Sequence, residues 1–388
     1  MRSEPYFYMF GLPMGPPQFA AAFLLLCFLG QCAWLAYTTP AAARSEIAPR
    51  AGSIPDIPRD PLVRLAVEVP IGVGHLIGLP WRDLLWLARL PFITLGVLLG
   101  ASIWYVARRL YGNIGGMGAL VLYCFSPMPF VVTQVGPIPI AALGMFGVVF
   151  ISIAVSHTLY APPRGGFGGE IRHRWRRVTT LGFAIALMVG AAPELSFMVL
   201  VALGMMFYLV PHRRREALGL MVAALAIAAP ILLLLAGPRW FAQAGFSPLA
   251  GWSAPRYVVH TSVASTSIVL TVIAASAAAV YLSSRRSRYF GNSAPLLATA
   301  LTLVLGLPSL GHAYLGAFPA WSLPLLFVFV GGIFADLAET PWRRAALLVF
   351  VVLASSLATL ELLAVGQHQW TSGGRELSPP AGVRRIRI

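Results

Sequence analysis

The chain alternates between apolar stretches of roughly twenty residues and short polar turns. A helix of about 20 apolar residues crosses the ~30 Å hydrocarbon core of a bilayer, and inside lipid it satisfies its own backbone polar groups. The pattern therefore predicts an all-α polytopic membrane protein with about eleven transmembrane helices. The predicted crossings are residues 19–37, 90–107, 114–132, 138–160, 178–192, 195–210, 217–236, 263–283, 294–310, 320–336 and 344–365.

Arginines at the ends of these stretches predict the orientation. Every second turn is rich in arginine, and the cytoplasmic loops of membrane proteins carry an excess of basic residues. We therefore expect a multi-pass protein of the cell membrane with a cytoplasmic N-terminus. The basic turns are 108–109, 172–177, 212–215, 285–288 and 343–344.

Composition agrees with this interpretation and narrows the expected partners. Of the 388 residues, 58% are hydrophobic and 11% are charged, whereas a soluble domain carries about 25% charged residues. A net charge of +15 can indicate nucleic-acid binding, but these arginines follow the turns between apolar stretches. We expect membrane lipid and no nucleic acid as a partner. Histidine and cysteine show no metal-ligand spacing, so no metal site is predicted.

The predicted organisation is one transmembrane domain, residues 1–365, followed by a polar tail, residues 366–388. Residues 38–88 form a long first extracytoplasmic loop. Within that loop, residues 69–81 are apolar but short and rich in Gly and Pro, which is typical of an interfacial or re-entrant segment rather than of a crossing.

One part of the chain resembles a known family. Residues 87–134, LARLPFITLGVLLGASIWYVARRLYGNIGGMGALVLYCFSPMPFVVTQ, resemble the second and third spans of the GT-C glycosyltransferases, among them the protein O-mannosyltransferase and aminoarabinose transferase relatives. The shared elements are Arg89-Leu90-Pro91, the turn 107–112, a glycine-rich third span and Ser126-Pro127. Residues 59–70 and 318–332 resemble further family segments more loosely. The short basic turn also predicts a tight hairpin, in which small residues allow close helix approach.

The resemblance implies that a sugar moves from a polyprenyl-phosphate donor to an extracytoplasmic acceptor. It implies a carboxylate in the first outer loop as general base and basic groups that hold the lipid phosphate. The candidate catalytic acids are Glu46, Asp56 and Asp60; the candidate phosphate-binding residues are Arg59, Arg256 and His260; Glu194 is a further candidate. Glu68 follows Arg64 by four residues, which predicts an ion pair on a helix instead.

The sequence departs from the family where catalysis is expected. The family shows an Asp-Glu pair shortly after the first span, but this chain reads TTPAAARSE, with Glu46 as its first acid. Two alternatives therefore stay open. One is a catalytically inactive GT-C-fold scaffold or partner subunit of a membrane complex, and the other is a transporter. No organic cofactor is expected, and the need for a divalent metal stays open.

Overall fold

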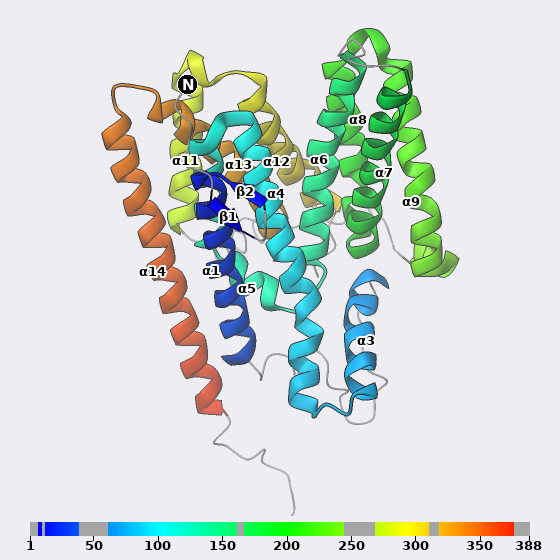
Figure 1. Ribbon diagram of the computed structural model, residues 1–388, viewed down its shortest axis with the longest axis vertical. Coiled ribbons are helices and arrows are strands. Elements are labelled where there is room, and N and C mark those ends of the chain that lie inside the picture. The colour runs from blue at the N-terminus through cyan, green and yellow to red at the C-terminus, as the bar shows by residue number, and fades with distance from the viewer. Residues whose placement is uncertain are drawn as a thin grey trace, which may run out of the picture.

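In the computed structural model, helices make up almost all of the described chain, which comprises residues 7–9, 12–38, 61–160, 167–243, 268–309 and 318–375 (Figure 1). A small antiparallel hairpin of β1 (Phe7–Met9) and β2 (Leu12–Met14) precedes the first helix. The α-helices are α1 (Pro16–Thr38), α3 (Pro61–Leu76), α4 (Trp81–Cys124), α5 (Met128–Thr133), α6 (Ile138–Tyr160), α7 (Phe167–Ala191), α8 (Phe197–Leu209), α9 (Arg214–Gln243), α11 (Ile268–Ser283), α12 (Phe290–Ser309), α13 (Phe318–Ala338) and α14 (Arg343–Arg375). Short 3₁₀ turns are η1 (Pro193–Ser196), η2 (Pro211–Arg213) and η3 (Arg285–Ser287).

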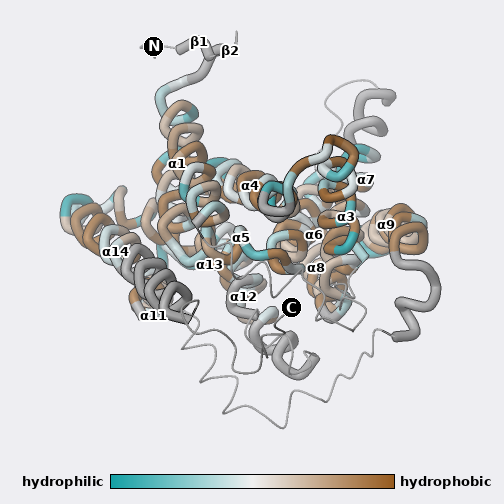
Figure 2. The backbone as a smooth tube through the Cα atoms, turned by 90° about the horizontal axis from the view of Figure 1, so that it is seen from below, coloured by the Kyte–Doolittle hydropathy of each residue, from teal (hydrophilic) through white to brown (hydrophobic). Residues whose placement is uncertain are grey.

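The helices have the length and composition expected of a membrane protein. Among the described residues, five stretches are long and apolar enough to cross a bilayer: Pro16–Tyr37, Trp86–Cys124, Ile138–Leu159, Pro211–Leu235 and Trp321–Ala338. Two shorter helices, α8 and α11, are also apolar. Peripheral helices such as α9 are as hydrophobic as those inside (Figure 2). A multi-pass membrane protein accounts for this exposed apolar surface, and eleven crossings stay a prediction.

The predicted hairpin is confirmed within α4. Gly112 has φ 76° and ψ −170°, which breaks the helix into two arms. A Cβ atom placed on Gly116 would lie 3.1 Å from the backbone nitrogen of Arg108, whereas these residues would be about 12 Å apart along a straight helix. The arms therefore run antiparallel. Glycine suits both positions, because it tolerates positive φ at Gly112 and lets the backbones touch at Gly116.

The second arm ends earlier than the sequence predicted. We expected one crossing over residues 114–132, but the arm stops at Cys124 and α5 begins at Met128. Ser126 and Pro127 fill the break, where the Ser126 hydroxyl donates to the carbonyl of Tyr123 at 2.9 Å. The predicted segment 69–81 is likewise divided, because residues up to Leu76 continue α3 and Trp81 starts α4.

Helix α13 forms the centre of the bundle and packs against α4, α6, α11 and α12. Its Phe327 is fully buried and meets the ring of Tyr123 edge-on at 6.3 Å. The Tyr123 hydroxyl donates to the carbonyl of Gly96 at 2.7 Å, which joins the two arms of α4 a second time. This core is built mostly from large apolar side chains, so it holds the helix ends in place without many polar contacts.

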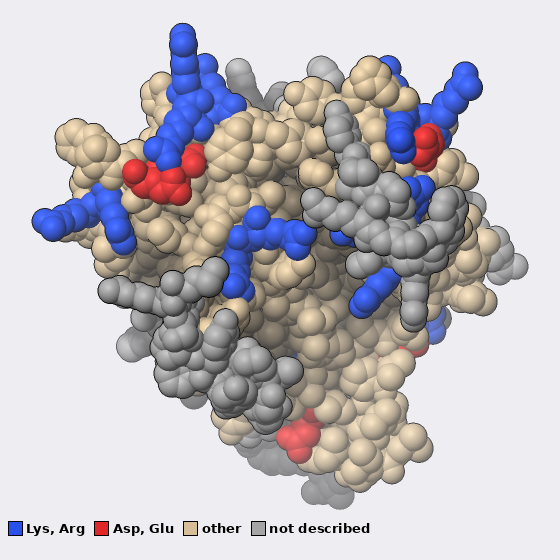
Figure 3. Space-filling model, turned by 45° about the horizontal axis from the view of Figure 1, so that its top comes forward, with Lys and Arg blue, Asp and Glu red and all other residues tan. Residues whose placement is uncertain are grey.

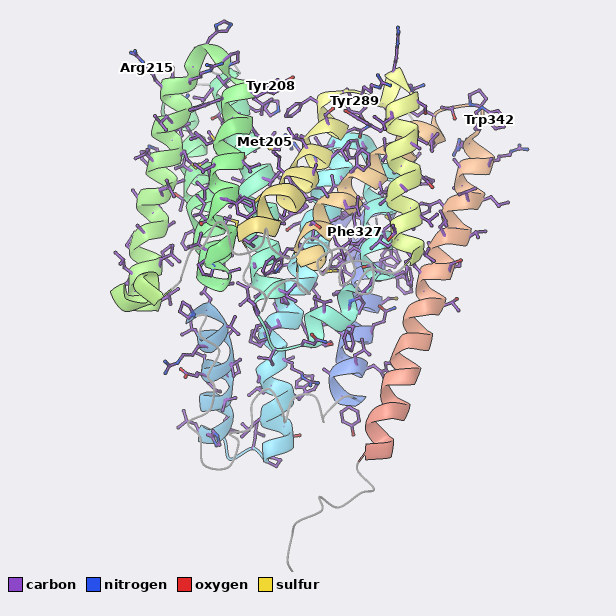
Figure 4. The ribbon with its side chains drawn as sticks, turned by 180° about the vertical axis from the view of Figure 1, so that it is seen from behind. Met205, Tyr208, Arg215, Tyr289, Phe327 and Trp342 are labelled. Carbon is purple, nitrogen blue, oxygen red and sulfur yellow. The ribbon has the colours of Figure 1, made fainter. Side chains whose placement is uncertain are left out.

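The basic turns lie together at one end of the molecule. Figure 4 shows Tyr208, Arg215, Tyr289 and Trp342 at this end, with Met205 and Phe327 further in, and Figure 3 shows basic side chains gathered over it. We call it the arginine-rich end. Helix α3, the start of α4 and the end of α14 lie at the opposite end (Figure 1). This separation is what the positive-inside pattern predicts for a cytoplasmic and an outer end.

Candidate functional site

Most of the predicted site residues fall outside the described part of the chain. These are Glu46, Asp56, Arg59, Asp60, Arg256 and His260. Glu194 is described through its backbone alone, in η1 directly after α7. The structure therefore describes the candidate site through the helices that flank these segments.

Those helices converge at Gly190, in the last turn of α7. A Cβ atom placed on Gly190 would lie 2.7 Å from Cδ1 of Leu62 and 3.2 Å from Cδ2 of Leu232. We call this contact the Gly190 junction. Leu62 belongs to the first turn of α3, directly after the loop of the candidate acids. Leu232 lies on α9, eleven residues before the helix ends at Gln243 and the chain enters the segment that carries Arg256 and His260.

The Gly190 junction also lies next to the turn that carries Glu194. After Gly190, α7 ends at Ala191 and the chain enters η1, whose second residue is Glu194. The helix residues that directly follow the first loop and directly precede the Glu194 turn thus meet at this junction, whereas α9 continues past Leu232 to Gln243. The sequence nominated these three regions separately, and it contained no signal that the flanking residues Leu62, Gly190 and Leu232 are in contact.

The other end of the first outer loop is fixed by a buried arginine. Arg89 is 3% exposed, and its Nη1 donates to the carbonyl of Ala36 at 2.7 Å. Ala36 lies in the last turn of α1, where carbonyls lack helical partners and carry partial negative charge. A guanidinium is well suited to that position. Arg89 therefore fixes the end of α1 against α4, just before the chain enters the loop of the candidate acids.

Helix α3 explains why Glu68 is a poor site candidate. Arg64 Nε donates to Glu68 Oε1 at 2.6 Å, and both side chains are about half exposed, at 55% and 51%. The predicted i,i+4 pair is confirmed. Leu65, Val69 and Val73 on the same helix are exposed, as on a helix that lies at a membrane surface.

A polar cluster ties the α4 turn to α12 and α13 at the arginine-rich end. Asn292, which is fully buried, donates through Nδ2 to Asp336 Oδ2 at 2.8 Å and to the carbonyl of Ser287 at 3.0 Å. The Tyr111 hydroxyl donates to the carbonyl of Gly291 at 2.6 Å. Burial, with the Asp336 carboxylate nearby, raises the pKa of Tyr289 to about 12, so this phenol stays neutral at physiological pH. The cluster therefore holds the α4 turn against α12, and α12 against α13.

A large hollow of the described chain lies between the first arm of α4, α6 and α7. It has a volume of about 1020 Å³ and runs between the first arm of α4 and α7, over α6. Its walls are mostly apolar, with Phe146 and Phe150 of α6 in contact at a ring distance of 4.7 Å. Arg109, His157 and Arg177 line it toward the arginine-rich end. Sequence reasoning missed this groove, because its lining comes from three helices.

Among the described residues, no group of three or more His, Cys, Asp or Glu side chains is placed to hold a metal ion.

No protein-family model, curated protein or solved structure matches the chain.

The resemblance to the GT-C glycosyltransferases therefore stays a prediction from residues 59–70, 87–134 and 318–332. What the geometry adds is the contact of α3, α7 and α9, the helices next to the three nominated regions, at the Gly190 junction.

Proposed function

We propose that the chain is a membrane glycosyltransferase that moves a sugar from a polyprenyl-phosphate donor to an acceptor on the outer side of the membrane. The observation that carries the proposal is the Gly190 junction. There the first turn of α3, which follows the acid-bearing loop, and the last turn of α7, which precedes the Glu194 turn, contact α9, which leads to the segment with Arg256 and His260. A carboxylate beside basic groups at a membrane surface is what transfer from a lipid phosphate requires.

The proposed chemistry uses one carboxylate as the general base and at least one basic side chain that binds the phosphate. Glu46, Asp56 or Asp60 removes the proton from the acceptor hydroxyl or amine. The acceptor atom then bonds to the anomeric carbon, and the bond from that carbon to the phosphate oxygen breaks. The electron pair leaves with the polyprenyl phosphate, whose charge is held by Arg59, Arg256 or His260. Arginine suits this role because its fork of N–H donors matches phosphate oxygens.

The test is transfer of sugar from polyprenyl-phosphate donors in membranes that carry the full chain. Glu46, Asp56, Asp60 and Glu194 are changed singly to Ala. Loss of the general base should lower transfer by about 10²–10⁴-fold. Glu68→Ala is the matched control, because Glu68 is paired with Arg64 on the neighbouring helix. If all four variants transfer as the unchanged chain does, the assignment of the base is wrong.

A second candidate is a non-catalytic scaffold or partner subunit. The observation that favours it is the sequence TTPAAARSE in place of the family's acidic pair. The same experiment separates the two. A chain that transfers nothing from any polyprenyl-phosphate donor, yet purifies with a fixed membrane-protein partner, supports the scaffold.

A further inference from the structure

The groove between α4, α6 and α7 has a shape that a lipid chain would fill. Helix α6 packs against both α4 and α7 and forms the floor. Most of the lining is apolar, including Leu98 of α4 and Phe183 of α7, which are both more than half exposed. A hollow of about 1020 Å³ is at the upper limit of the ~300–1,000 Å³ common for ligand sites. Its open apolar sides suit an occupant that enters from the bilayer.

The length of the groove matches one leaflet. It runs along the first arm of α4 from Leu98 to Arg109, which is about 16 Å at 1.5 Å per residue. Along α6 it runs from Leu143 to His157, about 21 Å by the same measure. Half of the hydrocarbon core is about 15 Å. The groove therefore accommodates an acyl chain of one leaflet, and it is shorter than a long polyprenyl chain would need.

The basic end of the groove is arranged for a phosphate. Arg177 reaches from α7 across to α6, where its Nη1 donates to the carbonyl of Ala154 at 2.6 Å. This contact uses one of the five N–H donors of a guanidinium and holds the side chain over the groove. Arg109 and His157 line the same end, and the described lining residues include no acid.

The neighbouring arginine, Arg108, makes its contacts outside the groove. Arg108 donates through Nε to Asn113 Oδ1 at 2.9 Å and lies over the ring of Trp104 at 5.1 Å. It is absent from the groove lining, although it is next to Arg109 in the chain. One arginine of the pair thus closes the turn of α4, and the other faces the groove.

We propose that this groove binds an anionic phospholipid of the leaflet at the arginine-rich end. Its phosphate contacts Arg109 and Arg177, and an acyl chain lies along α6 over Phe146 and Phe150. Basic pockets between transmembrane helices on the cytoplasmic side recognise anionic headgroups in this way. The site is distinct from the sugar-transfer site proposed above, which lies at the opposite end, and it does not depend on that proposal.

The test measures displacement of fluorescent phosphatidylglycerol from the purified full chain in neutral detergent. Unlabelled phosphatidylglycerol should compete at least tenfold better than phosphatidylcholine or polyprenyl phosphate. Arg109→Gln and Arg177→Gln should each weaken phosphatidylglycerol binding about five- to tenfold. Ala101→Phe, which fills the apolar part of the groove, should abolish saturable binding.

Two control variants show whether an effect on lipid binding is specific to the groove. Arg344→Gln removes a charge from the same end outside the groove, and Ala345→Phe adds a ring to an exposed position of α14. Both should bind as the unchanged chain does, and thermal unfolding of every variant confirms that it is folded. Equal competition by phosphatidylcholine overturns the proposal. So does stronger competition by polyprenyl phosphate, or unchanged binding in folded Ala101→Phe. Each of these outcomes is independent of whether the chain transfers sugar.

Discussion

The two ends of the molecule are held together in different ways. At the arginine-rich end, connections are short and backbones touch, as between Gly116 and Arg108, and the buried amide of Asn292 joins α12 to α13. At the opposite end, long connections follow or precede helices that are held by side chains distant in the chain: the Arg89 guanidinium on α1 and the side chains around Gly190. Short turns and close backbones therefore help to fix the first end, whereas the proposed transfer site depends on contacts around long connections.

The largest expected effect is at the first end. Gly116→Leu places a Cβ atom 3.1 Å from the backbone nitrogen of Arg108, and backbone cannot move aside as a side chain can. We expect a loss of about 3 kcal/mol in the free energy of unfolding, at the upper end of overpacking costs. The measurement is an unfolding titration with denaturing detergent in mixed micelles.

Gly219→Leu is the matched control for this variant. A Cβ atom on Gly219 of α9 meets nothing within 4 Å, and leucine forms helix better than glycine does. We expect unchanged or slightly higher stability. Equal destabilisation by both variants would mean that the antiparallel arms do not approach as closely as described.

The next effect is at the opposite end. Arg89→Gln removes a charged donor from the carbonyl of Ala36 in a buried place, and such hydrogen bonds contribute about 1.5–3 kcal/mol. We expect a loss of about 2 kcal/mol in the same titration, together with greater protease access to the loop after α1. Arg344→Gln, at an exposed position at the start of α14, should change stability by less than about 0.5 kcal/mol. A similar loss in both variants would contradict the role given to Arg89.

Much of this architecture was predictable because membrane helices are specified locally. The apolar stretch 138–160 coincides with α6, and Arg108, Arg109 and the following glycines predicted the hairpin. The predicted end of the second arm of α4 was wrong, because the apolar stretch continues past Cys124 while Ser126 and Pro127 interrupt the helix. Apolar composition reports what lipid tolerates, and it does not report where a helix bends.

The site was less predictable, because its parts are distant in the chain. Acids and arginines could be nominated from the outer segments, but the meeting of Leu62, Gly190 and Leu232 has no sequence signature. Gly190 carries the same local pattern as many glycines in apolar helices. The groove was also not predictable from the sequence, because Arg109 and Arg177 belong to separate basic turns that the positive-inside pattern alone explains.

A smaller effect is expected at the Gly190 junction. Gly190→Leu forces the new side chain against Leu62 and Leu232, which are side-chain neighbours that can shift. We expect a loss of about 1–2 kcal/mol. Adding Leu62→Ala should restore part of it, because the double variant has room for the new side chain and neighbouring substitutions are not additive. If the two losses simply add, Leu62 is not the neighbour that limits this position.

The smallest effect concerns the surface of α3. Arg64 and Glu68 are both about half exposed, so a double-mutant cycle with Arg64→Ala and Glu68→Ala should give a coupling of about 0.3–0.5 kcal/mol. Salt at 1 M should remove most of it, because the screening length falls to about 3 Å. A coupling above about 1 kcal/mol would mean that a partner covers Arg64 and Glu68. In that case the end opposite the arginines would be held by that partner and not by the Gly190 junction alone.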